Sequence, residues 1–212
     1  MNINYLLYNI SMKGVFRMSI FLTSDTHFES DKTLIRENRP FRNSNTFANY
    51  VLNLWNHQVS KDDIIYHLGD FLNYNQNDRS NWQKALKRVP QINCKVILII
   101  GNNEERVIRE FFNNNFEEFK KYCKKIGFYD VEKEAYIEIK NKKFYLNHFP
   151  INHKDNFINL FGHVHRTTGL CKPFGINVGC DLNHFLLYDE DEIFRILENK
   201  ELYWDSDENC LS

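Results

Sequence analysis

The stretch DIIYHLGDF, residues 63–71, decides the fold class of this chain. Its first part, residues 63–68, is a short run of branched and aromatic side chains that ends at Gly69 and Asp70. Continuous apolarity over so few residues indicates a strand buried on both faces, as in the centre of an α/β protein. The polar residue that follows such a strand is placed where α/β proteins usually build their sites.

Two other stretches repeat this pattern. SIFLTS at 19–24 is followed by Asp25 and His27, and CKVILII at 94–100 is followed by a turn that contains Asn102. The segments beside and between these strands carry apolar residues at helical spacing. We expect helices at residues 44–58, 79–89, 103–112 and 115–128. The first half of the chain therefore predicts a β-α-β-α-β arrangement.

The second half predicts mostly strands. Residues 135–148 alternate around Asn141-Lys142 and indicate a β-hairpin. Further strands are expected at 157–162, 175–180 and 184–188, followed by a helix near 189–199. Two sheets facing each other with helices outside accommodate both halves in one domain. We expect this single domain to span residues 18–212 and residues 1–17 to form an N-terminal extension outside the core.

Composition excludes several classes of protein. Apolar residues make up 42% and charged residues 26% of the chain, as in ordinary globular proteins. A net charge of −1 gives no basis for coating nucleic acid or an anionic membrane. The five cysteines are odd in number and form no C-x-x-C pair, which favours a reducing compartment and a cytoplasmic location. No apolar stretch approaches the length of a membrane span.

The stretch LFGHVHRTTG, residues 160–169, places two histidines on either side of one valine. In an extended segment His163 and His165 would project from the same side. Two neutral imidazoles that face one position suit a metal ion. A loop with two solvated histidines explains this stretch equally well, so the rest of the chain must decide.

The residues at the strand ends favour the metal. Each has a structural explanation of its own, such as a helix cap or a turn. Together they supply two carboxylates, one amide and four imidazoles, a mixture that suits Mn²⁺, Fe, Zn²⁺ or Ni²⁺ better than Ca²⁺ or Mg²⁺. The candidate ligands are Asp25, His27, Asp70, Asn102, His148, His163 and His165. Two divalent ions would outweigh the two aspartates by two positive charges. The site would therefore suit a negatively charged phosphate ester.

The ordered set D-x-H, G-D, G-N-x-E, a lone H and G-H-x-H resembles the calcineurin-like metallophosphoesterase superfamily from residue 19 to about 181. The stretches YHLGDF, NRPF and NVGCD resemble its small bacterial and phage branch. The resemblance implies a four-layer α/β/β/α sandwich and two divalent ions, manganese first, with Fe, Zn, Ni or Mg as alternatives. It implies that Asp25, His27, Asp70 and His165 hold the first ion, and that Asp70, Asn102, His148 and His163 hold the second.

Two departures from the family pattern bear on the reaction. Many relatives have a histidine that assists the leaving group where this chain has Asn103. General acid catalysis is therefore in doubt, and His153 is a candidate substitute against the alternative of a plain surface histidine. Relatives in this branch often have Gly-His where this chain has Glu29-Ser30, and an acidic rim would discourage a doubly charged monoester.

These observations predict a metal-dependent phosphodiesterase that acts on small phosphate esters or on nucleotides, cyclic ones included. A hydroxide activated by the two ions would attack phosphorus, and Asp70, Asn102 and His163 are the expected catalytic residues. The expected substrate contacts are Arg39, Arg42, Asn103 and Arg166. The alternatives are a phosphomonoesterase or nucleotide pyrophosphohydrolase with the same site, and a non-catalytic scaffold that binds a partner protein. The sequence carries no signal for nucleic-acid or membrane partners.

Overall fold

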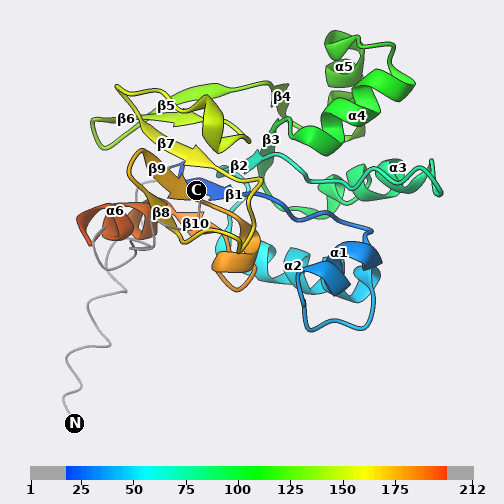
Figure 1. The fold of residues 1–212 in the computed structure, drawn as a ribbon, viewed down its shortest axis with the longest axis horizontal. Coiled ribbons are helices and arrows are strands. Elements are labelled where there is room, and N and C mark those ends of the chain that lie inside the picture. The colour runs from blue at the N-terminus through cyan, green and yellow to red at the C-terminus, as the bar shows by residue number, and fades with distance from the viewer. Residues whose placement is uncertain (1–17, 200–212) are drawn as a thin grey trace, which may run out of the picture.

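The computed structural model describes residues 18–199, which form two five-stranded sheets with helices around them (Figure 1). The predicted extension at residues 1–17 lies outside the described residues. The expected α/β fold with two facing sheets is confirmed. That the domain runs to residue 212 stays a prediction.

The first sheet carries the three strands that the sequence predicts most clearly. Its order is β10-β1-β2-β3-β4, with β1 to β4 parallel and β10 antiparallel to β1. In register, Leu22 lies opposite Tyr66, and Tyr66 lies opposite Ile97. The strands are β1 Ile20–Thr23, β2 Ile64–Leu68, β3 Lys95–Ile99, β4 Asp130–Glu132 and β10 Tyr188–Asp189.

The second sheet has the order β5-β6-β7-β9-β8. The predicted hairpin is confirmed as β5 and β6, while β6, β7 and β9 run parallel to one another. The strands are β5 Ala135–Ile139, β6 Lys142–Leu146, β7 Ile158–Phe161, β8 Cys171–Lys172 and β9 Gly175–Asn177. Because β6 and β7 are parallel neighbours, the residues after them lie at the same edge of this sheet.

The helices follow the predicted apolar stripes. Helix α2 matches the predicted range, and its first turn is capped by Asn43, whose side chain accepts a hydrogen bond from the Thr46 amide. The α-helices are α1 Asp31–Arg36, α2 Ser44–Gln58, α3 Asn81–Leu86, α4 Asn102–Phe111, α5 Phe116–Ile126 and α6 Glu190–Glu198. Short 3₁₀ helices lie at Val89–Gln91, Pro150–Asn152 and Cys180–Leu182.

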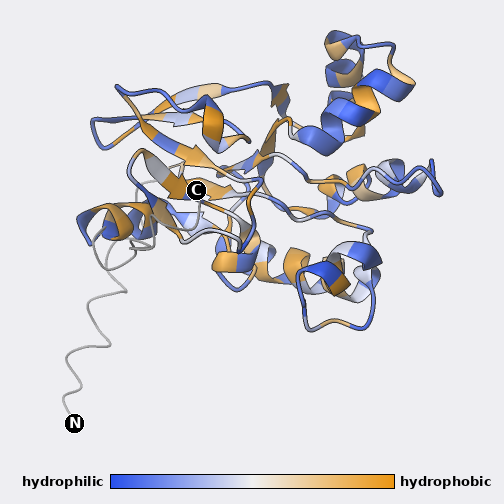
Figure 2. Ribbon diagram, in the orientation of Figure 1, coloured by the Kyte–Doolittle hydropathy of each residue, from blue (hydrophilic) through white to orange (hydrophobic). Residues whose placement is uncertain are grey.

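Both faces of the first sheet are buried, which explains its continuous apolar strands. Phe21, Ile65 and Leu98 belong to a core cluster shared with α2 to α5, whereas their neighbours Leu22 and Ile99 belong to a cluster between the two sheets. Helix α6 contributes to this second cluster at the edge of the sandwich. The hydropathy colouring agrees, since the strands are mostly hydrophobic and the helices carry one hydrophobic and one polar face (Figure 2).

The predicted strand at 184–188 is wrong. Only Tyr188 lies in a strand, because His184 and Phe185 adopt left-handed backbone angles, with φ of 50° and 68°, and turn the chain. This turn directs the Phe185 carbonyl toward the Trp55 indole, which donates a hydrogen bond of 3.0 Å to it. The short elements α1, β4 and β8 were not predicted.

No helix within residues 18–199 combines the length and apolarity that crossing a bilayer requires.

Candidate metal centre

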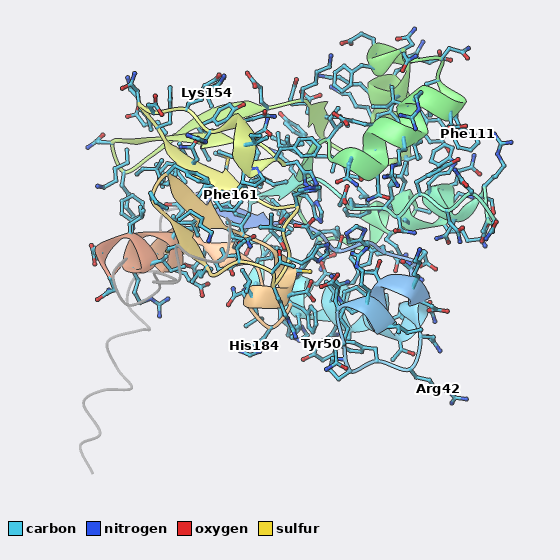
Figure 3. The ribbon with its side chains drawn as sticks, in the orientation of Figure 1. Arg42, Tyr50, Phe111, Lys154, Phe161 and His184 are labelled. Carbon is cyan, nitrogen blue, oxygen red and sulfur yellow. The ribbon has the colours of Figure 1, made fainter. Side chains whose placement is uncertain are left out.

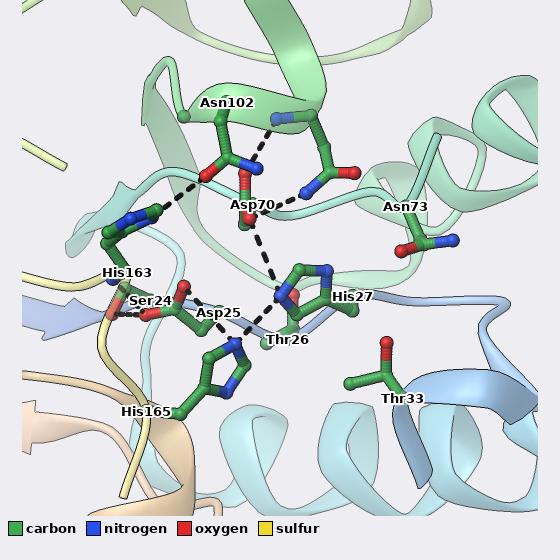
Figure 4. A network of polar contacts seen from close by, with 12 residues as sticks. Ser24, Asp25, Thr26, His27, Thr33, Asp70, Asn73, Asn102, His163 and His165 are labelled. Carbon is green, nitrogen blue, oxygen red and sulfur yellow. Dashed lines mark hydrogen bonds and ion pairs between the residues drawn. The ribbon is translucent and has the colours of Figure 1, made fainter. Parts of the chain in front are cut away.

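The parallel strands of the first sheet deliver three side chains to one edge. Asp25 follows β1, Asp70 follows β2, and Asn102 begins α4 after β3. Because β1, β2 and β3 are parallel neighbours, these residues lie side by side. The second sheet brings His148 after β6 and the two histidines of the GHVH stretch after β7. With His27, two residues after Asp25, the seven predicted ligands meet where the two sheets face each other, and Figure 4 labels all of them except His148.

One cluster of donor atoms consists of Asp25, His27, His165 and an oxygen of Asp70. The Nε2 atoms of His27 and His165 lie 3.1 Å apart, and their rings stack. His27 Nε2 lies 3.5 Å from Asp70 Oδ2, and His165 Nε2 lies 3.9 Å from Asp25 Oδ1. Two nitrogens about 3 Å apart have the spacing of adjacent ligands on one ion with metal–nitrogen bonds of about 2.1 Å.

The other cluster consists of Asn102, His148, His163 and the second oxygen of Asp70. Asn102 Oδ1 lies 2.9 Å from His163 Nδ1 and 3.1 Å from His148 Nε2. The two histidine nitrogens are 3.2 Å apart, and His148 Nε2 lies 3.7 Å from Asp70 Oδ1. Asp70 therefore presents one oxygen to each cluster.

The buried atoms fit cations. Asp25 Oδ1 is buried and has no hydrogen-bond partner among the described residues, so it is an acceptor in need of a positive charge. His148 Nδ1 donates to the Leu68 carbonyl at 2.7 Å, and this leaves the Nε2 lone pair free for a metal. His165 Nδ1 likewise donates to Asp181 Oδ2 at 3.1 Å, which makes Nε2 the acceptor nitrogen that faces the cluster.

Electrostatics inside the site also favour cations. Burial and the neighbouring His165 hold the pKa of His27 well below its usual value, so its imidazole stays neutral. Burial raises the pKa of Asp70, with the nearby Asp25 carboxylate acting in the same direction. Burial disfavours the ionised form of this carboxyl, and a metal ion beside it would stabilise that form.

The ligands reach these positions through unusual backbone angles. Five of the seven have positive φ, namely Asp25 at 61°, His27 at 47°, Asp70 at 53°, His163 at 73° and His165 at 46°. This corrects the expectation of an extended GHVH segment. The two histidines lie in turns, and they enter different clusters because each residue bends the chain. Such conformations cost free energy and are typical of functional sites.

Two glycines allow the loops to approach this closely. A Cβ at Gly69, whose φ is +85°, would lie 2.5 Å from His148 Nδ1. A Cβ at Gly101 would lie 2.5 Å from Asp70 Oδ1. Real Cβ atoms do not approach this near, so the glycines in the G-D and G-N motifs are steric requirements of the site.

Glu104 holds the turns that carry Asp70 and Asn102. It is fully buried and accepts hydrogen bonds from the amides of Asp70, Leu72 and Gly101, at 2.8, 3.2 and 2.8 Å. Glu104 therefore supports both turns. Burial, with the carboxylate of Asp70 nearby, raises the pKa of Glu104 to about 7.

The two clusters open into one polar cleft of about 1240 Å³. Its walls come from α1, the 73–78 loop, α3, α4 and the GHVH turn. The cationic side chains that line it are Lys32, Arg36, Arg106 and Arg109. None of these four was predicted from the sequence as a substrate contact.

The arginines that were predicted have other positions. Arg39 is buried, and its guanidinium donates to both Asp181 oxygens at 2.8 Å and to the carbonyls of Asp25 and Thr26, so it is structural. Arg42 is exposed at the outer rim, away from the cleft (Figure 3). Arg166 is exposed and donates to the Asp181 carbonyl, and it does not line the cleft.

Asn103 lines the cleft, but both polar atoms of its amide are engaged. Its Nδ2 donates to Asp70 Oδ2 at 2.6 Å, and its Oδ1 accepts from the Tyr74 amide at 3.0 Å. Its backbone amide also donates to Asp70 Oδ1, at 2.9 Å. Asn103 therefore orients the shared carboxylate, which the sequence did not indicate.

The structure also places His153, the candidate proton donor, and Glu29, the acidic residue expected at the rim. His153 stacks on Phe174 at 4.4 Å and lines a separate groove, so it does not supply a proton in the cleft. Glu29 lies at the rim as predicted, but Arg88 Nε donates to it at 2.7 Å, so its charge is neutralised. Its predicted effect on doubly charged substrates is correspondingly weakened.

The model of the family described as "Calcineurin-like phosphoesterase" matches residues 18–206. The chain belongs to the calcineurin-like phosphoesterase family. Family membership and the donor clusters together support a metal-dependent phosphoesterase that uses divalent ions.

Individual relatives of this phosphoesterase are distant. An uncharacterised protein of Methanocaldococcus jannaschii is 31% identical over 86 residues, which are 41% of this chain and 47% of that protein, so the match spans about half of the relative's length. A protein of unknown function from Aquifex aeolicus has a crystal structure that matches with a TM-score of 0.60 and 19% identity, covering 85% of this chain and all of that chain. An archaeal phosphodiesterase matches with a TM-score of 0.42 and 18% identity, over 76% and 82% of the two chains.

Proposed function

We propose that this phosphoesterase hydrolyses phosphodiester bonds of small phosphate esters or nucleotides, cyclic nucleotides included, with two divalent ions, Mn²⁺ first among them. The observation that carries the proposal is the meeting of two donor clusters at Asp70, at the base of an open polar cleft. Asp25, His27, Asp70 and His165 would hold one ion. Asp70, Asn102, His148 and His163 would hold the other.

When bound, the two ions would supply an activated water and neutralise charge on the phosphoryl oxygens. The protein contributes position and charge balance. Asp25 and Asp70 bring two negative charges against four positive ones, so the site attracts a phosphate anion. Asn103 and Glu104 fix the Asp70 loop by hydrogen bonds. These bonds hold the two donor clusters in fixed positions relative to each other.

The preference for diesters rests on the leaving group. Asn103 stands where many relatives place a histidine, and an amide releases no proton. Esters with a stable leaving group or a strained ring suffer least from this loss. A monoester that leaves as an unstrained alkoxide needs the proton that Asn103 does not supply, whereas a strained cyclic diester or an aryl diester depends on it less.

The preference for nucleotides rests on the cleft walls. Amide side chains line the cleft beside the donor clusters, and an amide can both donate and accept hydrogen bonds, as base edges and sugar hydroxyls require. These residues are Asn73, Asn75, Gln76, Asn77 and Asn81. A volume of about 1240 Å³ leaves room for groups on both sides of a phosphate.

A panel of substrates tests the proposal. Metal-free protein is reloaded with Mn²⁺, Ni²⁺, Zn²⁺ or Mg²⁺ and assayed on an aryl diester, the matching aryl monoester and cyclic nucleotides. We expect metal-dependent turnover that favours diesters in kcat/KM. A preference for the monoester would support the alternative enzyme, and no turnover with any ion would favour a non-catalytic scaffold.

A further inference from the structure

Arg36, at the end of α1, reaches into the first donor cluster. Its Nη2 lies 3.2 Å from Nε2 of His165, the nitrogen that faces His27 and Asp25. A guanidinium is permanently charged and offers only donors. Arg36 is therefore a second source of positive charge at the position where the first ion would be held.

The backbone around Arg36 is fixed on both sides. Ser30 caps the start of α1 by accepting from the Thr33 amide at 3.1 Å, and the Arg39 amide donates to the Leu34 carbonyl at 2.8 Å. Arg39 is in turn held by its buried pair with Asp181. Helix α1 thus has little freedom to move relative to the donor clusters.

The side chain of Arg36, in contrast, is only half buried. It is 52% exposed, and its ion-pair partner is the adjacent residue Glu37. The Glu37 side chain is largely buried and holds Arg36 through Nε. Arg36 thus combines a fixed base with terminal N–H groups that face the donor cluster.

The positive charge of Arg36 and of the first ion determines which ligand fits between them. Glu37 accepts from Arg36 Nε, whereas Arg36 Nη2 faces the donor cluster, where a divalent ion beside it would favour an anion between the two cations. A phosphoryl group satisfies both, because it offers one oxygen to the ion and others to the N–H groups of an arginine. The cleft leads directly from Arg36 to the donor cluster, so a phosphate has access to this position.

We infer that Arg36 is a phosphate-binding residue, which holds a non-bridging oxygen of the scissile phosphoryl group beside the first ion. This inference rests on the proposed function. It assigns to Arg36 the role that the sequence suggested for Arg39 and Arg42. The Arg36→Ala variant should lose substrate affinity, and Arg36→Lys should recover part of it, because lysine keeps the charge but not the planar fork.

The test is binding of inorganic phosphate to the Mn²⁺-loaded protein, measured by titration calorimetry. Arg36→Ala should weaken phosphate binding about tenfold or more, the range for hydrogen bonds to a charged group. Arg36→Lys should lie between it and the wild type. Arg42→Ala is the matched control, since it removes the same charge outside the cleft, and its affinity should stay within about twofold. Manganese content should be equal in all four proteins.

Equal phosphate affinity in the wild type and Arg36→Ala would overturn the inference alone. Loss of manganese from Arg36→Ala would also overturn it, because Arg36 would then support the metal site and not the phosphate. A wild-type protein that binds neither manganese nor phosphate would overturn the proposed function and this inference together.

Discussion

Asp70 links the two donor clusters through its two carboxylate oxygens. Asp70→Asn keeps the size of the side chain and removes the charge, so both ions should be lost. We expect metal affinity and hydrolysis to fall by more than about 100-fold, beyond the loss typical of an outer-shell partner. Metal analysis after dialysis and an aryl diester assay measure both effects.

The matched control is Asp62→Asn, an exposed position in the turn just before the start of β2. It should bind metal and turn over as the wild type does. Retained metal and full activity in Asp70→Asn would contradict the shared-ligand assignment.

The leaving-group dependence follows from Asn103, whose amide is hydrogen-bonded to Asp70 and Tyr74. Without a general acid, replacing a p-nitrophenyl leaving group by an alkyl one should lower kcat by at least about 10²-fold. A series of diesters with increasing leaving-group pKa gives the slope. Similar rates across the series would mean that another group in the cleft supplies the proton.

The sequence predicts which residues gather at the site better than it predicts which side chains line the cleft. Asp25, Asp70 and Asn102 could be predicted because strand direction alone places them at one edge. Arg36 and Arg39 are only three residues apart, and no sequence pattern distinguishes the arginine that enters the cleft from the one that pairs with Asp181. That distinction depends on how α1 turns against the Cys180–Leu182 helix.

Helix α1 is tied to the Cys180–Leu182 segment by the Arg39–Asp181 pair, whose side chains are both fully buried. Arg39→Ala would leave the Asp181 carboxylate buried without a cation. We expect a loss of about 3–5 kcal/mol in the free energy of unfolding, measured by urea denaturation. A double variant with leucine at both positions should lose much less. A change below about 0.5 kcal/mol in Arg39→Ala, as expected for Arg42→Ala, would contradict this role.

The same pair makes stability depend on pH. Although burial opposes it, the hydrogen bonds from His165 and Arg39 lower the pKa of Asp181 from 3.8 to about 2. A carboxyl whose folded pKa is depressed stabilises the protein above its unfolded pKa, and this contribution is lost as pH falls toward the folded value. It amounts to about 2 kcal/mol at pH 7 and roughly half of that at pH 3.

Asp181→Asn removes this titration, so the stability difference between variant and wild type should shrink by about 1 kcal/mol between pH 7 and pH 3. Urea denaturation at both values measures it. A difference that is constant with pH would show that Asp181 does not titrate with a depressed pKa.

Elements with one strong periodicity could be predicted, and short elements could not. Helix α2 and the β5–β6 hairpin carry clear patterns over many residues, whereas β4 and β8 have three and two residues. The segment 184–188 is apolar because Phe185 and Leu187 enter the helix-side core, not because it forms a strand. A short apolar segment in the sequence can be a strand or a buried turn, and its hydrophobic pattern does not distinguish the two.

Across the whole molecule, two sheets of different character meet at one edge. The first contributes carboxylates and an amide from parallel strands, and the second contributes three histidines from its β6 and β7 ends. This division could be predicted from the order of motifs along the chain. The left-handed backbone at five ligands could not be predicted, because it depends on how the two sheets pack.

The most direct test is the anomalous diffraction of crystals grown with Mn²⁺. The proposed centre predicts two peaks about 3.5–4 Å apart, with Asp70 between them. One peak should contact Asp25, His27 and His165, and the other Asn102, His148 and His163. A single peak, peaks elsewhere, or no peak under saturating manganese would contradict the two-ion centre.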